Sequence, residues 1–318
     1  MTPLVSVAVL TYNSEGTIRQ CIDSILMQET DFDYEIVVGD DCSIDGTQDV
    51  LREYKNCHPD KFTLLLNERN EGISKNYQRV LTHCRGEYVA LCEGDDYWTD
   101  ECKLRKQVAF LESHVEYGFV GTYSQLLLSD GQIKEDFYDY MPKLEVVDGW
   151  ELYGDVFDYA KVGPVTRTVS LCFRRSIIVP YLQYEGLGND LVIQTVLSKH
   201  SWFAKYSQAM TIYRQGGVST DKMSFEKQLY YNDWYVGNRL LQKQLFPDEC
   251  NWNEAELSDR GDYIRLKKAI CERDWKKALE IKHNLRTEKY RKKRFAKFLL
   301  GPLSCFVCSL VVNQKNYE

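Results

Sequence analysis

The chain has 318 residues and a formal net charge of −7, with 44% hydrophobic and 27% charged residues. This balance supports a packed core and excludes wholesale disorder. The acidic charge, with no basic cluster in the first 280 residues, argues against a nucleic-acid-binding protein. Eleven scattered cysteines, an odd count, and a start without a signal peptide lead us to expect reduced thiols and a cytoplasmic protein.

Strands and helices are expected to alternate through the first hundred residues. The apolar run at 4–13 predicts a buried strand ending at Thr11, followed by a helix from Asn13 or Ser14. The same plan repeats along the chain. Its further strands are expected within 34–47, 61–67 and 87–96, and its further helices after residue 47 and over 72–84.

This alternation predicts an α/β fold with a doubly wound, mostly parallel sheet, whose ligands bind at the carboxyl ends of the strands. Three acidic loops follow strands and should therefore gather along one rim. They contain Asp40-Asp41, Asp45 and the group Glu93, Asp95 and Asp96. Like charges repel, so such a rim persists only where a cation or a hydrogen-bonding ligand compensates them.

The pattern changes after residue 115. Residues 118–133 predict strands joined at an Asp130-Gly131 turn, and 168–176 predicts another strand. Residues 189–200 predict a short amphipathic helix with Leu191, Val192, Thr195 and Val196 inward, and 202–217 predicts one or two strands. From about 222 the chain looks helical to near 298, with packing aromatics at Phe225, Tyr231, Trp234 and Tyr235.

Three parts are therefore expected: a main domain over 1–220, a helical extension over 221–297 and an apolar tail over 298–318. The tail is too short to span a bilayer, and Gly301-Pro302 interrupts it. It follows a strongly basic stretch at 286–297, and this combination favours peripheral contact with an anionic membrane surface. The alternative is a terminal helix that packs on the protein.

The acidic rim has a chemical interpretation of its own. Carboxylates on a loop after a strand, completed by substrate phosphates, suit Mg²⁺ or Mn²⁺. The metal then neutralises a diphosphate leaving group as it departs. Asp40, on a different strand end, is placed to accept hydrogen bonds from a nucleobase or ribose.

Four segments together resemble the inverting family 2 glycosyltransferases of the GT-A fold, and the nearest look-alikes are bacterial enzymes that build surface polysaccharides. The resemblance covers roughly residues 3–220 in order and spacing. The segments are VSVAVLTYNSEGTIRQCIDSILMQ, EIVVGDDCSIDGTQDVL, NEGISKNYQRVLTHCRGEYVALCEGDDYWTDECKLRKQVAFLE and YRQGGVS.

The resemblance implies a nucleotide pocket at the ends of the first strands. Asp40 matches the family's acceptor from the uracil ring, and Asp41 is expected to brace its loop with Ser43 and Thr47. Glu15 either lies in the pocket or caps the helix. The remaining residues implied to hold the nucleotide are Thr11, Tyr12, Asn13, Lys75 and Asn76.

The resemblance also implies a metal motif. Asp96 would bind the Mn²⁺ or Mg²⁺ ion and the diphosphate, and Asp95 would touch the ribose or the metal. Glu93 stands where relatives have Asp, so its side chain is one methylene longer. The late segment lacks the His of many relatives; Gln215 is a poor metal ligand, and Arg214 is implied to hold the diphosphate instead.

An inverting transfer needs one base opposite the leaving nucleotide. Asp190, in the first turn of the helix after the acceptor-side strands, matches the family's base. The acceptor cleft is expected near Trp98, Arg167 and Ser170. Purely structural alternatives stay open for these residues. Asp190 would then only interact favourably with the helix dipole, Asp95 and Asp96 would cap the next helix, and Trp98 would be a core residue.

The sequence thus predicts a metal-dependent inverting glycosyltransferase at the inner face of the cell membrane. It would transfer a sugar from a nucleotide sugar, most simply a UDP-sugar, to a hydroxyl of a saccharide or lipid-linked saccharide. One rival is a nucleotidyltransferase, which the loop TYNSEGT disfavours because it has one Gly and no Lys. The other rival is a non-catalytic nucleotide-sugar-binding protein.

Overall fold

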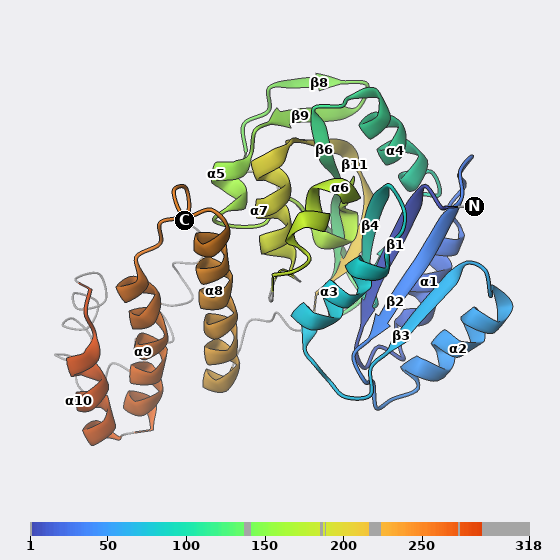
Figure 1. The fold of residues 1–318 in the computed structure, drawn as a ribbon. Helices are drawn as coiled ribbons and strands as arrows, with labels where there is room; N and C mark the ends of the chain where they lie inside the picture. The colour runs from blue at the N-terminus through green and yellow to red at the C-terminus, as the bar shows by residue number, and fades with distance from the viewer. Residues whose placement is uncertain are drawn as a thin grey trace. The chain divides into compact units, whose positions relative to one another are not determined.

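The computed structural model describes residues 2–136, 141–184, 187, 189–215, 224–272 and 274–287. The chain forms two compact units, residues 1–220 and 221–318 (Figure 1). In the described residues no helix is long and apolar enough to cross a membrane. The apolar tail expected over 298–318 lies outside the described residues, as does the basic stretch before it except residues 286 and 287.

One mixed sheet organises the first unit. Its order is β3-β2-β1-β4-β10-β6-β11-β9-β8, with β5 beside β11 and β7 beside β6. The strands are β1 (Val5–Thr11), β2 (Tyr34–Asp40), β3 (Phe62–Leu66), β4 (Tyr88–Glu93), β5 (Tyr97–Trp98), β6 (Tyr117–Leu127), β7 (Ile133–Asp136), β8 (Glu145–Val147), β9 (Trp150–Gly154), β10 (Cys172–Arg174) and β11 (Trp202–Arg214).

Helices cover both faces of this sheet (Figure 1). In the first unit they are α1 (Ile18–Leu26), α2 (Thr47–Cys57), α3 (Ile73–His83), α4 (Lys103–Ser113), α5 (Phe157–Ala160), α6 (Arg175–Ile178) and α7 (Asp190–His200), with short 3-10 turns at Thr168–Ser170 and Val179–Tyr181. The second unit contains α8 (Phe225–Leu245), α9 (Glu254–Cys271) and α10 (Trp275–Asn284).

The predicted fold class is confirmed. β3, β2, β1 and β4 are parallel neighbours, and β6 and β11 continue in the same direction beyond the antiparallel β10. All seven residues of β1 and of β2 are buried, as expected for strands covered on both faces. The register pairs Thr11 with Asp40 and Leu10 with Glu93, so the acidic loops do meet at one rim.

The two faces of β1 pack against different helices. Val7 and Val9 share a hydrophobic core with Ile22 of α1 and Leu51 of α2. On the other face α3 packs against β1 and β2. The alternating side chains of one buried strand therefore fix helices above and below the same rim.

Several local predictions were wrong. The first helix begins at Ile18, because Asn13 adopts a positive φ of 52° and the backbone carbonyl of Ser14 accepts hydrogen bonds from the amides of Thr17 and Ile18. In the stretch 168–176 only Cys172–Arg174 is a strand. The helix from Asp190 is buried on all sides from Leu191 to Ser198, so it is not amphipathic.

Other predictions hold. Residues 202–214 form a single strand, and β6 and β7 are an antiparallel pair on either side of the predicted turn. The region after 224 is helical as far as residue 284. Of its predicted packing aromatics only Tyr235 has a described side chain, half-buried between the guanidinium groups of Arg239 and Arg260.

The division at residue 220 predicts that the first unit folds by itself. A fragment of residues 1–220 is expected to unfold in one cooperative transition, because its sheet and covering helices form their own core. Circular dichroism during urea denaturation, with the full chain as reference, measures this. A fragment without a cooperative transition would show that the first unit depends on the second.

Candidate active site

The acidic rim is built around a tight turn after β4. Glu93 is the last residue of the strand, Gly94 and Asp95 form the turn, and Asp96 precedes β5. A Cβ atom at Gly94 would lie 2.8 Å from the Cβ and Oγ1 atoms of Thr11, so only glycine lets this turn pack directly on the end of β1. The turn thus carries three carboxylates to one place at the carboxyl end of the sheet.

These carboxylates are held in an unfavourable state. Burial, with the charges of Asp96, Asp95 and Asp190, raises the pKa of Glu93 well above its usual range. Burial also raises the pKa of Asp95 and of Asp96, which is 2% exposed. Glu93 Oε1 accepts a hydrogen bond from the Tyr77 hydroxyl at 3.4 Å, while its Oε2 atom is buried without a partner.

This arrangement fits a divalent cation. The ligands are hard carboxylate oxygens, Asp95 lines an open pocket, and a cation would relieve the repulsion that helps to raise the pKa of Glu93 and of Asp96. Among the described residues, three metal-type side chains come within 4.8 Å of one another only at Glu29, Glu101 and Cys102, which are largely exposed. Asp95 and Asp96 would therefore share a metal with substrate oxygens rather than enclose it.

Asp190 lies close enough to Glu93 for its charge to help raise the pKa of that carboxyl. It is the first residue of α7, where the Asn189 side chain caps the helix by accepting from the Val192 amide at 3.0 Å. Asp190 Oδ1 accepts from the Leu191 amide at 2.8 Å, and Oδ2 accepts from the Thr168 hydroxyl at 3.3 Å. Burial raises the pKa of Asp190.

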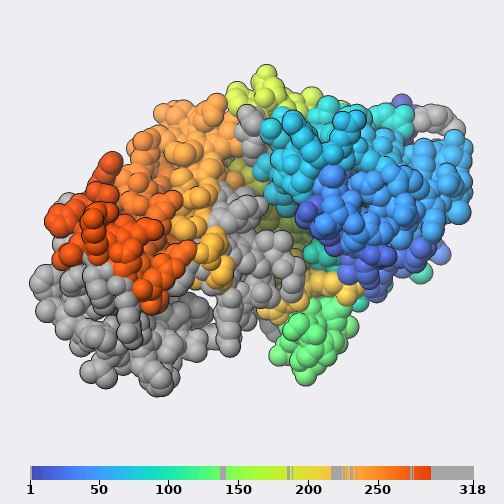
Figure 2. Space-filling model, turned by 90° about the horizontal axis from the view of Figure 1, so that it is seen from below, coloured from blue at the N-terminus to red at the C-terminus, as the bar shows by residue number. Residues whose placement is uncertain are grey.

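A pocket of about 550 Å³ opens beside Asp95. Its lining residues come from the β1–α1 loop, the β4–β5 turn, the β6–β7 turn and the end of β11. They are Tyr12, Asn13, Ser14, Thr17, Asp95, Leu127, Leu128, Ser129, Gly131, Arg214 and Gln215. The β6–β7 hairpin, green in Figure 2, projects from its unit at this place. Four predicted ligand-binding residues, Tyr12, Asn13, Asp95 and Arg214, thus share one pocket.

Arg214 connects the pocket to the acid pair. Its backbone amide donates to Asp96 Oδ1 at 2.8 Å, and its guanidinium lies 5.4 Å from the centre of the Tyr97 ring. Nη2 donates to the Gln20 side chain, whereas Nε is buried without a partner. The Arg214 guanidinium is therefore a positive charge held next to the acidic turn, and its Nε–H group has no hydrogen-bond acceptor.

The loop after β2 departs from the prediction. Asp40 is fully buried, and its carboxylate accepts from the Ser43 amide at 3.0 Å, from Gln48 Nε2 at 2.6 Å and from the Ser43 hydroxyl. Contact of Asp40 with a nucleobase stays a prediction. In the described structure its role is to hold its own loop.

The roles expected of Asp41 were wrong. Asp41 accepts from Asn67 Nδ2 and from the amides of Glu71 and Gly72, each at 2.8 Å, so it braces the loop before α3. Thr47 donates to Asp45 instead, through both its amide and its hydroxyl.

Glu15 does not cap α1. It accepts from the Gly46 amide at 3.1 Å, and its own amide donates to Asp45 at 3.1 Å. The loops after β1 and β2 are therefore tied together. Behind them, buried Asn76 donates from Nδ2 to the Gly39 carbonyl at 2.8 Å, while its Oδ1 atom and Thr11 Oγ1 are buried without partners. Lys75 is exposed on α3.

Two residues predicted for the acceptor cleft belong to the core. Trp98 is 1% exposed, donates from Nε1 to the Val169 carbonyl at 2.9 Å and lies under the Lys103 ammonium. Ser170 is fully buried, and its hydroxyl donates to the Arg167 carbonyl at 2.8 Å. Neither presents a surface to a substrate, so both acceptor predictions were wrong.

The third acceptor residue, Arg167, is half-buried near the site. It forms a two-pronged ion pair with Asp136, at 2.5 and 3.2 Å, and its guanidinium lies 4.6 Å from the centre of the Tyr213 ring. Its charge opposes the rise in the pKa of Asp96 and Asp190. Sequence reasoning missed Tyr77 and Thr168: helical spacing made Tyr77 a core residue, and no local signal distinguished Thr168 from its neighbours Arg167 and Ser170.

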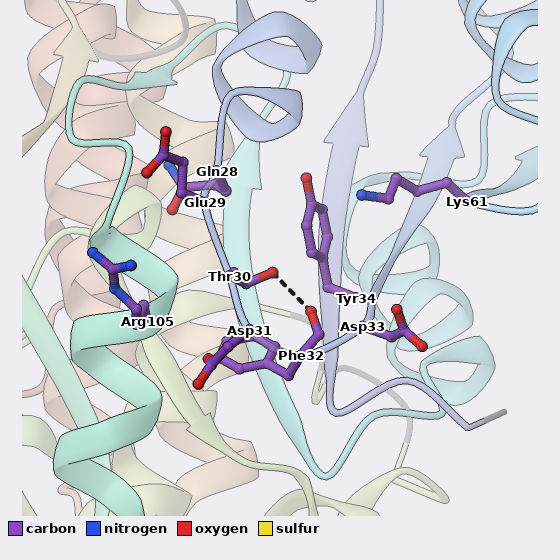
Figure 3. A pocket seen from close by; sticks show the side chains of 9 residues that line it. All are labelled: Gln28, Glu29, Thr30, Asp31, Phe32, Asp33, Tyr34, Lys61 and Arg105. Atoms are coloured by element: carbon purple, nitrogen blue, oxygen red, sulfur yellow. Dashed lines mark hydrogen bonds between the residues drawn. The ribbon is translucent and has the colours of Figure 1, made fainter.

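A second pocket, of about 590 Å³, lies at the opposite end of the sheet (Figure 3). It includes Tyr34, the first residue of β2, and is lined by Gln28, Glu29, Thr30, Asp31, Phe32, Asp33, Tyr34, Lys61 and Arg105. Its two cations face three carboxylates, and the Lys61 ammonium lies 3.5 Å from the Tyr34 ring centre. Ligands of parallel sheets bind at the other end, so this pocket receives no assignment.

Comparison with known proteins identifies relatives of the first unit. Residues 6–160 match the family described as glycosyl transferase family 2. The putative glycosyltransferase EpsE of Bacillus subtilis is 38% identical over 38% of this chain and 42% of its own length. The putative teichuronic acid biosynthesis glycosyltransferase TuaG of the same organism is 35% identical over 42% of this chain and 52% of its own length. The chain thus spans about half or less of these relatives.

A longer match joins the chain to the Escherichia coli UDP-Glc:alpha-D-GlcNAc-diphosphoundecaprenol beta-1,3-glucosyltransferase WfaP, 25% identical over 69% of this chain and 81% of that protein. Among solved structures, Staphylococcus aureus TarS in complex with UDP aligns with TM-score 0.52 and 19% identity over 83% of this chain and 71% of that one. The mannosyltransferase PcManGT from Pyrobaculum calidifontis, in complex with GDP-Man and Mn²⁺, aligns with TM-score 0.51 and 15% identity over 100% of this chain and 89% of that one. These structural matches establish the GT-A type fold.

The buried carboxylates predict an unusual pH dependence of stability. A carboxyl whose pKa is higher in the folded protein than in the unfolded chain destabilises the fold once the pH exceeds its unfolded value, about 4.3 for Glu. Glu93→Gln is therefore expected to gain stability over the parent as the pH rises from about 4 to 8 without divalent cations. The gain in melting temperature should be about 2–4 °C for each kcal/mol.

Thermal denaturation in the presence of a chelator measures this gain. Glu112→Gln, at an exposed position, is the matched control and should change stability by no more than about 0.5 kcal/mol at any pH. A Glu93→Gln difference that does not grow with pH would show that the folded protein does not hold Glu93 under charge repulsion.

Proposed function

We propose a donor, an acceptor class and a mechanism for this chain, which over residues 6–160 belongs to glycosyl transferase family 2. The chain transfers a sugar from a nucleotide sugar to a hydroxyl of a saccharide or lipid-linked saccharide, in cell-surface polysaccharide biosynthesis. The observation that carries the proposal is the placement of Asp190, in the first turn of α7, within electrostatic reach of the Glu93–Asp96 turn.

The proposed donor is a UDP-sugar. UDP and UDP-GlcNAc are named with the TarS structures, and UDP-Glc with WfaP, whereas GDP-Man is named with PcManGT. In this chain the ends of β1 and β2 supply polar groups that a nucleoside would satisfy. Thr11 Oγ1 and Asn76 Oδ1 are buried and unpartnered there, and Tyr12 and Asn13 line the adjoining pocket.

The diphosphate of the donor lies between Asp95, Asp96 and Arg214. The two aspartates would hold a Mn²⁺ or Mg²⁺ ion. When bound, this ion would neutralise the negative charge of the departing diphosphate. Arg214 adds a fixed positive charge on the other side, and its unpartnered Nε–H is available to a phosphate oxygen. Burial and the neighbouring charges raise the pKa of Glu93, so a cation at the turn would favour the ionised form of this carboxyl.

Asp190 is the proposed general base. Its carboxylate takes the proton of the acceptor hydroxyl as that oxygen attacks the anomeric carbon, and the bond from this carbon to the nucleotide diphosphate breaks on the opposite face. One displacement of this kind inverts the anomeric configuration. Burial, which raises the pKa of Asp190, makes its carboxylate a stronger base than a solvent-exposed one.

The acceptor and location are proposed from the relatives and from the tail. The relatives' names mention teichuronic acid, poly(ribitol-phosphate) and a diphosphoundecaprenol-linked sugar. Such acceptors place the chain at the inner face of the cell membrane. The basic and apolar sequence over 286–318, of which only 286 and 287 are described, would hold it there.

The metal assignment predicts a nucleotide response that depends on the cation. UDP with Mn²⁺ is expected to raise the melting temperature. At a UDP concentration of a hundred times the dissociation constant, the free energy of unfolding should increase by about 2.7 kcal/mol. Asp96→Asn should lose this response while keeping its circular dichroism spectrum, and Asp60→Asn, at an exposed site, should retain it. Equal stabilisation with and without Mn²⁺ would contradict the metal role of Asp96.

The base assignment predicts a variant that binds but does not transfer. Asp190→Asn keeps an oxygen to accept from the Leu191 amide but loses the base, so UDP release in the presence of acceptor should fall about 10²- to 10⁴-fold with donor affinity unchanged. Asp49→Asn, the same change in the first turn of α2, is the control. Full activity of Asp190→Asn would refute the role; pyrophosphate release in place of UDP would indicate a nucleotidyltransferase.

A further inference from the structure

The turn that faces Asp190, residues 165–170, is held to α7 by one buried side chain. Gln194, on the second turn of α7, is fully buried. Its Oε1 atom accepts from the amides of Val165 and Thr166 at 2.8 and 3.1 Å, and its Nε2 atom donates to the Thr166 carbonyl at 3.1 Å. Base and turn therefore belong to one hydrogen-bonded body.

The same turn is held from the side of the metal motif. Trp98, two residues after Asp96, donates from its indole to the Val169 carbonyl at 2.9 Å. Gln107 of α4 donates to the Ser170 carbonyl at 2.8 Å. Because all of these donors are buried, releasing the turn would leave polar groups unpaired in the core. The turn is thus a rigid connection between the acid pair and α7.

In the half-buried part of this turn, Thr168 contacts Asp190. Its hydroxyl donates to Asp190 Oδ2 at 3.3 Å, while Oδ1 is engaged by the Leu191 amide. We propose that Thr168 is a positioning residue for Asp190, and that Gln194 holds it in place by fixing the turn on α7. The catalytic meaning of this contact rests on the proposed function; the contact itself does not.

The hydroxyl acts on Asp190 in two ways. It directs one carboxylate oxygen, which leaves a defined lone pair for an acceptor hydroxyl. It also stabilises the charged carboxylate, in the same sense as the Arg167 guanidinium and against the burial and the Glu93 charge that favour the neutral form. Among the described residues, Tyr77 of α3 also lies within electrostatic range of Asp190.

A matched pair of variants tests the proposal. Thr168→Val keeps the shape but removes the hydroxyl, and Thr168→Ser restores it. The first readout is carbodiimide labelling of Asp190 against pH, followed by peptide mass spectrometry, which reports its protonation without substrate. The labelling midpoint is expected to move to higher pH in Thr168→Val and to stay at the parent value in Thr168→Ser. The midpoint of exposed Asp49, on the same molecules, should stay constant.

The second readout is UDP release from UDP-glucose and UDP-GlcNAc over the same pH range. Thr168→Val is expected to lose about tenfold in kcat with KM unchanged, and Thr168→Ser to recover most of it. An Asp190 midpoint that Thr168→Val leaves in place overturns the proposal, whatever the activity. A shifted midpoint in a protein that releases UDP from neither donor supports the contact and counts against the proposed function, so the two failures are distinguishable.

Discussion

The repulsion among the carboxylates of the turn after β4 is the constraint on which the site depends. Packing overcomes it: Gly94 lies against Thr11, and Asp96 accepts from the Arg214 backbone amide. Nearby, Asp40 accepts hydrogen bonds from its own loop, and Asp41 accepts them from the loop before α3. Among the carboxylate oxygens of the described residues, the one that is buried without a hydrogen-bond partner is Glu93 Oε2, in the β4 turn. The fold thus stores electrostatic cost where a cation and a diphosphate would bind.

A second constraint sets the opposite wall of the site. Asp190 and the turn of residues 93–96 come from elements far apart in sequence. Buried amide and indole donors nevertheless connect them through residues 165–170. These bonds explain why Trp98 and Ser170 lie in the core: both belong to the buried contacts that hold the turn against which Asp190 lies. A single displacement needs base and leaving group on opposite faces of one sugar, and a rigid connection of this kind preserves that distance.

The sequence was sufficient for the sheet, the acidic rim and the helix that begins at Asp190, because buried parallel strands and the turn residues after them have strong local signals. It was insufficient where side chains choose among near neighbours. Asp40, Asp41 and Asp45 are similar in type and close in sequence, so only the three-dimensional loop decides that Ser43 pairs with the first and Thr47 with the last. The apolar surroundings of Trp98 follow from tertiary packing as well. The start of α1 at Ile18 depends on a positive φ at Asn13, which no periodicity indicates.

The most direct measurement is anomalous diffraction from crystals of the full chain grown with UDP and Mn²⁺. A manganese peak between the carboxylates of Asp95 and Asp96 and the diphosphate, with Asp190 facing the terminal phosphate across a space for one sugar, is the predicted result. A peak at Glu29, Glu101 and Cys102 instead, or UDP bound away from the β4 turn, would contradict the account.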